Sequence, residues 1–139
     1  MNISADLLAE LLAHVQEDPV NECCGVIAVE LGASDGDARA VRVLRARNIH
    51  ASPLKFEIDP DELLRLWKEI EGEGCELGGI YHSHVRSAPY PSQTDVNFAA
   101  NWPGVEWVIV GLADGEPEVR SYVIEAGVVR EVAVGEEVP

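Results

Sequence analysis

Histidine, serine and aspartate side chains gather within fourteen residues of this sequence, at His82, Ser83, His84, Ser92 and Asp95. In a strand, alternate side chains point the same way, so His82 and His84 would project from one face and Ser83 from the other. Two imidazoles on one face suit a small divalent metal ion, and the Asp95 carboxylate would supply a third ligand. Three protein ligands with a fourth position for water are typical of a catalytic zinc site, whereas four protein ligands close a structural one.

A capping box is the competing interpretation of the second half of this stretch. Ser92 and Asp95 have the spacing at which a serine caps a helix and an acid three residues later returns a hydrogen bond to the cap. Taken alone, this spacing favours the cap. Both interpretations can hold for Ser92, but they compete for Asp95, because a carboxylate bound to a metal is less available to the helix.

An upstream acid, Glu22, lies just before an apolar and β-branched segment. Considered alone, it is one of 25 acidic residues, and a solvated loop acid is its simplest interpretation. His14 falls late in the first predicted helix, where a favourable contact with the helix dipole is explanation enough. His50 falls in a predicted loop, and neither histidine is assigned a role.

Hydrophobic patterning predicts the elements that would position these residues. Helices are predicted over residues 4–17, over 59–72 and from 92 onward, with Ser4, Asp59 and Ser92 as caps and Pro60 at the first helical position. The apolar stripes of the first two helices comprise Leu7, Leu8, Leu11, Leu12 and Val15, and then Leu63, Leu64, Trp67 and Ile70.

Strands are predicted in the second half of residues 21–29 and over 40–47, 56–58, 75–83, 105–112, 118–125 and 128–134. A loop is predicted over 32–37, and the last two strands would form a hairpin that turns at Ala126 and Gly127. Three helices and about seven strands, without an internal repeat or a linker, predict a single mixed α/β domain over residues 1–139.

Composition excludes several classes of partner. The chain has 25 acidic and 10 basic residues and a net charge of −15, so no basic stripe is available for nucleic acid or for an anionic membrane. A salt-adapted host or a solvated surface explains the acidity more simply than a cationic partner does. The start of the chain lacks the basic and apolar regions of a signal peptide, and no apolar run approaches the ~20 residues of a membrane span. Three cysteines without a Cys-x-x-Cys pair favour a reducing cytoplasm.

In combination, these residues resemble the signature of the JAMM (MPN+) zinc metalloprotease family, which has an upstream Glu, then His-Ser/Thr-His, seven residues, Ser, two residues and Asp. The positions that match are Glu22, His82, Ser83, His84, Ser92 and Asp95. The resemblance covers nearly the whole chain and is closest to the compact prokaryotic members of the Mec type. It implies an α/β (α+β) fold, a curved mixed sheet flanked by helices that is similar to cytidine deaminases.

The resemblance also implies roles for individual residues. His82, His84 and Asp95 would bind one zinc ion per chain, Glu22 would act as the general acid/base, and Ser92 would stabilise the oxyanion. The chemistry is consistent, because zinc lowers the pKa of a bound water to about 7 and a neighbouring carboxylate can move its proton. No covalent intermediate is needed, so Cys23 and Cys24 are interpreted as small core residues and not as nucleophiles.

Other metal-dependent families fit less well. A cytidine deaminase would need His-x-Glu and a later Pro-Cys-x-x-Cys, and a thermolysin-like protease would need His-Glu-x-x-His; all three motifs are absent. An amidohydrolase that uses His-x-His would need a (β/α)₈ barrel of about 250 residues.

The family hydrolyses peptide or isopeptide bonds at the C-terminal tails of ubiquitin-like proteins. A chain of 139 residues has little room for the insertions of eukaryotic members, so the resemblance implies a cytoplasmic prokaryotic (iso)peptidase acting on β-grasp sulfur carriers of the ThiS/MoaD/CysO type. The alternative is a non-catalytic MPN-type interaction module that binds a β-grasp partner. The regions from Asn48 to Ile58 and from Val85 to Pro91 are candidate walls of a substrate groove, and the sequence leaves the oligomeric state open.

Overall fold

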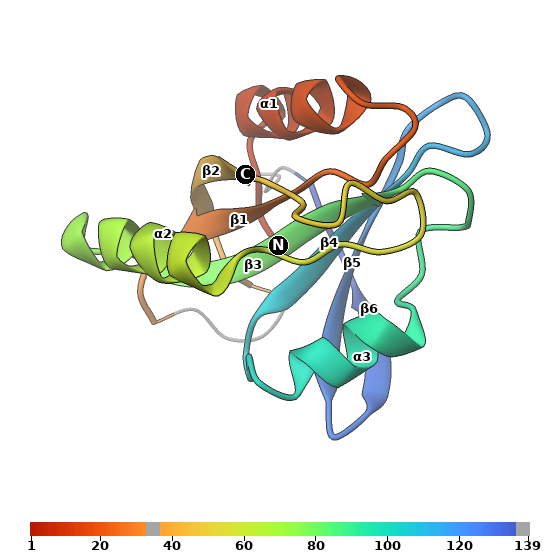
Figure 1. The fold of residues 1–139 in the computed structure, drawn as a ribbon. Helices are drawn as coiled ribbons and strands as arrows, with labels where there is room; N and C mark the ends of the chain where they lie inside the picture. The colour runs from red at the N-terminus through yellow and green to blue at the C-terminus, as the bar shows by residue number, and fades with distance from the viewer. Residues whose placement is uncertain (33–36, 136–139) are drawn as a thin grey trace.

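A six-stranded mixed sheet forms the framework of the protein, seen here in a computed structural model that describes residues 1–32 and 37–135. In chain order the strands are β1 (Cys24–Val29), β2 (Ala40–Ala46), β3 (Glu76–His84), β4 (Glu106–Gly111), β5 (Glu118–Glu125) and β6 (Val128–Val132). Their spatial order is β2-β1-β3-β4-β5-β6 (Figure 1). Only β3 and β4 pair in parallel, and the other neighbours are antiparallel, which confirms a mixed sheet.

Three helices cover the two faces of this sheet: α1 (Ala5–Gln16), α2 (Pro60–Gly72) and α3 (Gln93–Ala99). Helix α1 packs on one face, where Leu11 and Val15 join the hydrophobic cluster that contains Tyr81. Helices α2 and α3 cover the opposite face, whose cluster contains Ile80 and Trp107 (Figure 1). Strand β3 therefore runs through the middle of a three-layered molecule and contributes alternate residues to both cores. In the described part of the chain, no helix is both long enough and apolar enough to cross a membrane.

The predicted helix starts are confirmed. The Ser4 side chain accepts a hydrogen bond from the backbone N–H of Leu7, and the Asp59 side chain accepts one from Glu62, with Pro60 at the start of α2. The predicted hairpin is confirmed as well, since β5 and β6 join at Ala126 and Gly127, which both have positive φ. Most of the loop predicted over 32–37 lies outside the described residues, because positions 33–36 are not described.

The strand predicted at residues 56–58 is wrong. Only an isolated bridge between Asn48 and Ile58 occurs there. The side-chain oxygen of Asn48 accepts a hydrogen bond from the backbone N–H of Glu57, and its amide donates to the backbone oxygen of Lys55. One side chain thus satisfies backbone groups that a partner strand would otherwise bind, and the segment stays irregular.

The apolar face predicted for α2 is also partly wrong. Leu66 and Ile70 are buried, whereas Leu64 and Trp67 are 44% and 40% exposed. Four of the five residues from Leu63 to Trp67 are apolar, more than the stripe that contacts the sheet can hold, so hydrophobicity alone does not fix which of them are buried. Trp67 instead lies edge-to-face against Trp102, in the turn that follows α3.

We predict that Gly25→Ala destabilises the fold. A Cβ at Gly25 would lie 2.4 Å from ring atoms of Tyr81, which is fully buried and whose hydroxyl is 2.6 Å from His14 Nδ1. Overpacking of this kind costs roughly 1–3 kcal/mol, and urea unfolding would measure it. Gly72→Ala at the end of α2 is the matched control, because nothing lies within 4 Å of its Cβ position. Equal stability of the two variants would contradict this account of the β1–β3 contact.

Candidate metal centre

The end of β3 places two imidazoles, and the start of α3 places a carboxylate, around one point. His82 Nε2 lies 3.0 Å from His84 Nε2, and Asp95 Oδ2 lies 3.2 and 3.6 Å from these two nitrogens. Ligand atoms about 2.1 Å from a tetrahedral zinc ion would be ~3.4 Å apart, so the three observed separations fit the triangular face of such a site. All three residues are buried, at 5% exposure or less.

His84 is held in the tautomer that a metal ligand needs. Its Nδ1 lies 2.8 Å from the backbone oxygen of Ala88, which can only accept, so Nδ1 carries the proton and the Nε2 lone pair is free. His82 is held by two neighbouring aromatic rings instead. The Phe56 ring stacks on the His82 imidazole with centroids 4.3 Å apart, and Trp107 contacts the imidazole edge-on. Among the described residues, His82 Nδ1 has no hydrogen-bond partner.

Asp95 is a helix cap and a neighbour of the imidazoles at the same time. Its Oδ2 accepts a hydrogen bond of 2.9 Å from the backbone N–H of Ser92, and the Ser92 hydroxyl accepts one of 3.2 Å from the N–H of Asp95. The capping box is therefore present, and the oxygen that serves it is the same Oδ2 that lies near the two imidazoles. A carboxylate has about four acceptor positions, and the helix start itself aims Asp95 at the histidines.

Glu22 lies close to the same two histidines. Ligand atoms of Glu22, His82 and His84 all lie within 4.8 Å of one another, and Glu22 is 6% exposed, which excludes the solvated loop acid. Its backbone is fixed, because its oxygen accepts a hydrogen bond from Asn48 Nδ2 and its N–H donates to the backbone oxygen of Ser52. Sequence position alone does not show this closeness, since Glu22 and His82 are brought together by the pairing of β1 with β3.

Ser83, Asn48 and Phe56 support the site in ways that the sequence did not predict. The Ser83 hydroxyl is fully buried and accepts a 2.9 Å hydrogen bond from the backbone N–H of Cys23, which fastens the residue next to Glu22 to the strand that carries both histidines. Its position between the two histidines was the one feature of the sequence that could have pointed to Ser83 as a support of the site. Asn48 and Phe56 lie in the region predicted as a groove wall, and Ala88 lies in the other, so both regions do reach the site.

The two carboxylates have opposite electrostatic environments. Burial raises the pKa of the Glu22 carboxyl to about 7, although the nearby His84 opposes this shift. Burial would also raise the pKa of Asp95, but the two imidazoles and the N–H of Ser92 outweigh it and hold that pKa well below its usual range. Asp95 therefore stays ionised at neutral pH, and Glu22 can exchange a proton there.

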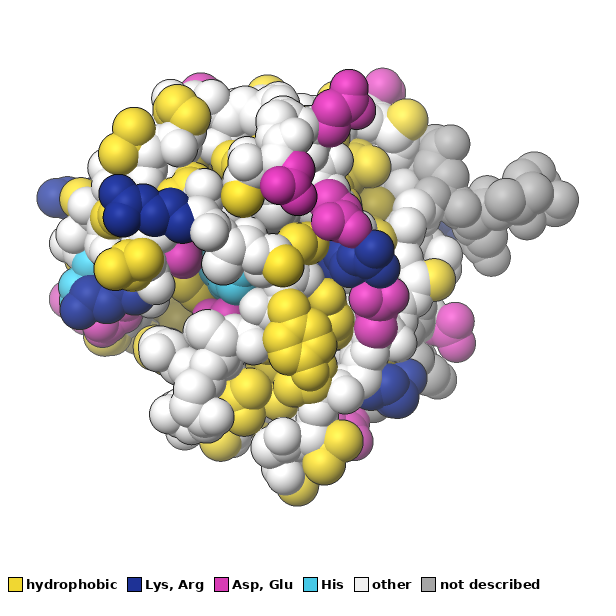
Figure 2. Space-filling model, turned by 90° about the vertical axis from the view of Figure 1, so that its right-hand side faces the viewer, with side chains coloured by type: hydrophobic (Ala, Val, Ile, Leu, Met, Phe, Trp, Pro, Cys, Tyr) yellow, Lys and Arg dark blue, Asp and Glu magenta, His cyan; other side chains and the backbone are white. Residues whose placement is uncertain are grey.

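The site opens to the surface in a hollow. Figure 2 shows a hollow with histidine and acidic side chains in it and with hydrophobic, basic and other groups along its border. Ser92 is exposed, and its hydroxyl oxygen already accepts a hydrogen bond, so its O–H remains free to donate to a molecule in the hollow.

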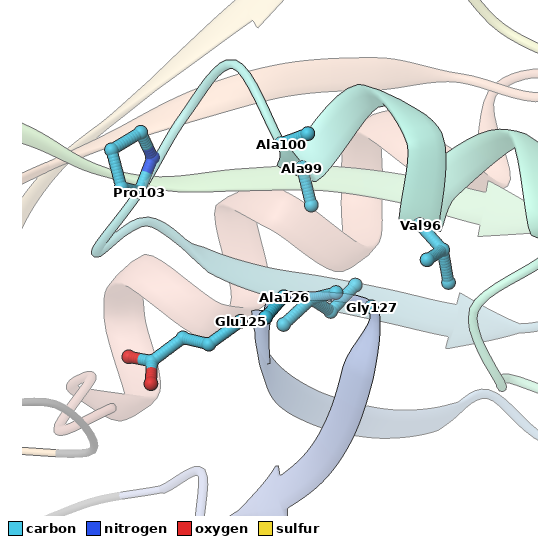
Figure 3. A pocket seen from close by; sticks show the side chains of 8 residues that line it. Val96, Ala99, Ala100, Pro103, Glu125, Ala126 and Gly127 are labelled. Atoms are coloured by element: carbon cyan, nitrogen blue, oxygen red, sulfur yellow. The ribbon is translucent and has the colours of Figure 1, made fainter.

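The remaining candidates for chemistry stay outside the site. Burial raises the pKa of the Cys24 thiol to about 12, and it raises that of Cys23 too, which argues against either as a nucleophile. His14 binds the Tyr81 hydroxyl, and His50 lies 2.9 Å from a Glu57 carboxylate oxygen at the surface. A separate cavity of about 170 Å³ between α3 and the β5–β6 turn is lined mainly by small and apolar side chains, among them Val96 and Ala126 (Figure 3).

Comparisons with known proteins give matches over most of the chain. The family model described as prokaryotic homologs of the JAB domain matches residues 4–125. A protein of Mycobacterium tuberculosis named CysO-cysteine peptidase is 36% identical over 133 residues, covering 95% of this chain and 88% of its own. A Haloferax volcanii protein named desampylase is 37% identical over 115 residues, covering 78% of each chain.

Solved structures show the same fold. A protein from Desulfitobacterium hafniense superposes with a TM-score of 0.78 at 33% identity, covering 98% of this chain and 93% of its own. A JAB1/MPN domain protein from Archaeoglobus fulgidus superposes with a TM-score of 0.60 at 21% identity, covering 98% of this chain and all of its own. The α+β fold with a mixed sheet flanked by helices, predicted from the resemblance, is confirmed.

The double role of Asp95 gives a prediction that separates metal binding from capping. Asp95→Ala should abolish zinc binding and lower the stability of the metal-free protein by about 1 kcal/mol through loss of the cap. Ser92→Ala is the matched control: it removes the other half of the capping box, should cost a similar amount, and should leave zinc in place. Metal analysis after zinc loading, together with urea unfolding of the metal-free proteins, measures both effects. Full zinc content in Asp95→Ala would refute the assignment of Asp95 as the third ligand.

Proposed function

The chain belongs to the family of prokaryotic JAB domain homologues, and from this membership we propose that it is a zinc-dependent peptidase. It hydrolyses the amide bond that follows the C-terminal tail of a ubiquitin-like, β-grasp sulfur-carrier protein. The observation that carries the proposal is the convergence of His82 Nε2, His84 Nε2 and Asp95 Oδ2 within 3.6 Å, with Glu22 beside them. The names of relatives, CysO-cysteine peptidase and desampylase, support this class of substrate.

The donor set of the site suits zinc. Two imidazole nitrogens and one carboxylate oxygen are the borderline ligands that zinc takes, and three of them leave a coordination position open. A zinc ion held by His82, His84 and Asp95 would supply a Lewis acid that polarises the scissile carbonyl and lowers the pKa of water.

The protein's own residues supply the proton transfers. Glu22, whose pKa is about 7, takes the proton of the attacking water and passes it to the departing amine. The free O–H of Ser92 donates to the oxygen of the carbonyl as negative charge develops on it. Asn48 and Ser83 both bind the peptide group that joins Glu22 to Cys23, and the N–H of Glu22 donates to Ser52, so that the Glu22 carboxylate is in place before the substrate arrives.

The C-terminal tail of the substrate must be in an extended conformation to reach the buried metal centre. The walls of its groove are the regions Asn48 to Ile58 and Val85 to Pro91, which flank the histidines through Phe56 and Ala88. A tail that ends in glycines would fit between such walls and could bind by backbone hydrogen bonds. The reaction takes place in a reducing cytoplasm, in line with three free cysteines.

A non-catalytic module that binds a β-grasp partner is the alternative. Such a module would need neither an ionised Asp95 nor a buried acid whose pKa is about 7, and the presence of both favours the enzyme.

The decisive prediction concerns Glu22. Glu22→Gln should bind one zinc ion per chain and fold like the wild type, but should lose activity by at least ~100-fold because the general base is gone. Substrates would be β-grasp sulfur carriers with C-terminal extensions, and intact mass would report the cleavage. Glu30→Gln, at an exposed acid that pairs with Arg39 beyond the far end of β1, is the control and should cleave normally. Zinc-loaded wild type that cleaves none of these carriers but binds them would favour the alternative.

A further inference from the structure

A buried ion pair that is not part of the metal centre joins the α-ammonium group of Met1 to the carboxylate of Glu106. The amine nitrogen lies 3.0 Å from Glu106 Oε1, and the two residues' groups are 0% and 2% exposed. The same Oε1 accepts a 2.8 Å hydrogen bond from the Ser121 hydroxyl, and the amine also donates to the backbone oxygen of Ala133. Two charges are buried together only where each compensates the other, so this contact is a built feature of the fold.

Glu106 depends on this ammonium group for the compensation of its charge. In the described part of the chain, no lysine, arginine or histidine side chain forms an ion pair with it. Its second carboxylate oxygen, Oε2, is buried and accepts no hydrogen bond from any described residue. A carboxylate removed from water is unfavourable unless a cation or several hydrogen-bond donors stabilise it. Loss of the positive charge on the amine would therefore leave a poorly compensated anion in the core.

The backbone next to the amine joins the two outer strands of the sheet, β2 and β6. Asn2 exchanges backbone hydrogen bonds with Ala38 and Ala40 where β2 begins. Gly135, which follows β6, exchanges two further backbone hydrogen bonds with residues 1–3. Isolated parallel bridges connect Asn2 to both sides. The first three residues therefore link the two edges of the sheet, and these bonds fix where the amine lies.

The Met1 side chain anchors the same segment in the core. It is 1% exposed and belongs to the hydrophobic cluster that contains Tyr81. A Cβ at Gly79 would lie 2.9 Å from Met1 Cε, so the glycine leaves the space that the methionine methyl group occupies. Gly79 is also the partner of Glu106 in the register of β3 and β4. Side chain, amine and counter-ion are thus packed against the central strands, unlike the loosely held terminus of most domains.

We propose that the α-amino group of Met1 is a structural cation of this fold, and that in a chain that begins at Met1 its acylation by a formyl or acetyl group breaks the link between the sheet edges. Acylation forms a bond from nitrogen to the acyl carbon and leaves a neutral amide with a single N–H. This amide cannot compensate the Glu106 carboxylate, and the added atoms must displace buried neighbours. The groups of the metal centre stay chemically unchanged, so the inference is independent of the proposed function.

Amine labelling tests whether the α-amine is protected in the folded protein. The chain has two lysines, Lys55 and Lys68, and both are exposed. In an unfolded chain near neutral pH, an α-amine reacts faster than a lysine. We expect N-hydroxysuccinimidyl acetate to label Met1 at least ~100-fold more slowly in the folded protein than in urea, because labelling needs local unfolding. Peptide mass spectrometry reads the three rates. Labelling of Met1 in the folded protein as fast as that of the lysines would overturn the proposal.

A stability cycle tests the charge. In a parent with Lys55→Arg and Lys68→Arg, the α-amine is the only amine left, and it is acetylated in urea before refolding. Acetylation should raise the unfolding equilibrium constant at least ~100-fold in this parent, because it leaves a buried carboxylate unpaired. With Glu106→Gln added, the same acetylation should raise the constant less than about tenfold, because the neutral side chain needs no cation.

Glu118→Gln, at an exposed acid on the neighbouring strand β5 that pairs with Arg120, is the matched control and should retain the full effect of acetylation. An equal effect in the parent and in the Glu106→Gln protein would overturn the proposal and leave Met1 a packing role only. If Glu106→Gln does not refold, the parent decides: a parent that is as stable with an acetylated as with an unmodified amine would also overturn it.

Discussion

Two imidazole nitrogens and one carboxylate oxygen lie within 3.6 Å of one another in nearly fully buried side chains, and the roles of the neighbouring residues follow from this contact. His84 presents a lone pair because the Ala88 oxygen holds the proton on its other nitrogen, and Asp95 presents an ionised carboxylate. Without a metal, hydrogen bonding from the imidazoles stabilises the Asp95 charge. In the proposed function the same three atoms form a preorganised ligand set, and a bound metal ion would replace the imidazole proton between them.

The fold brings the four side chains of the site together through β3 and the elements next to it. The central strand supplies both histidines, the antiparallel pairing with β1 brings Glu22 to its end, and the start of α3 supplies Asp95. The hydrogen bond from Cys23 to Ser83 joins the first two of these contributions. A six-stranded sheet buried by helices on both faces is a rigid support, which suits a site whose atoms must be placed within tenths of an ångström.

The division of labour between the two carboxylates follows from their surroundings. Asp95 receives two imidazoles and a backbone N–H, so its charge is stabilised and it can act as a ligand. Glu22 is also buried, but fewer groups stabilise its charge, and its pKa near 7 lets it take up and release a proton. Two acids that the sequence could describe only as a cap and a loop residue thus acquire different chemistry from burial and hydrogen bonding.

Much of this could be predicted from sequence because the signals were local. Helix caps at Ser4 and Asp59, the hairpin at Ala126 and Gly127, and the His-x-His pair all depend on residues close together in the chain. The failures concern tertiary contacts. The segment 56–58 is not a strand because Asn48 binds its backbone, and Trp67 is exposed because packing against the sheet decides the phase of α2. The supports of Glu22 were missed for the same reason, since Ser83 and Asn48 reach it only in the folded chain.

The assignment of ligands is the central claim, and a crystal structure of the zinc-loaded protein with anomalous scattering at the zinc absorption edge tests it most directly. The account predicts one anomalous peak within about 2.0–2.2 Å of His82 Nε2, His84 Nε2 and an Asp95 carboxylate oxygen. Glu22 should then lie beside the ion without binding it directly. A peak coordinated by Glu22 in place of Asp95, with Asp95 serving only the helix cap, or a peak elsewhere on the molecule, would contradict the account.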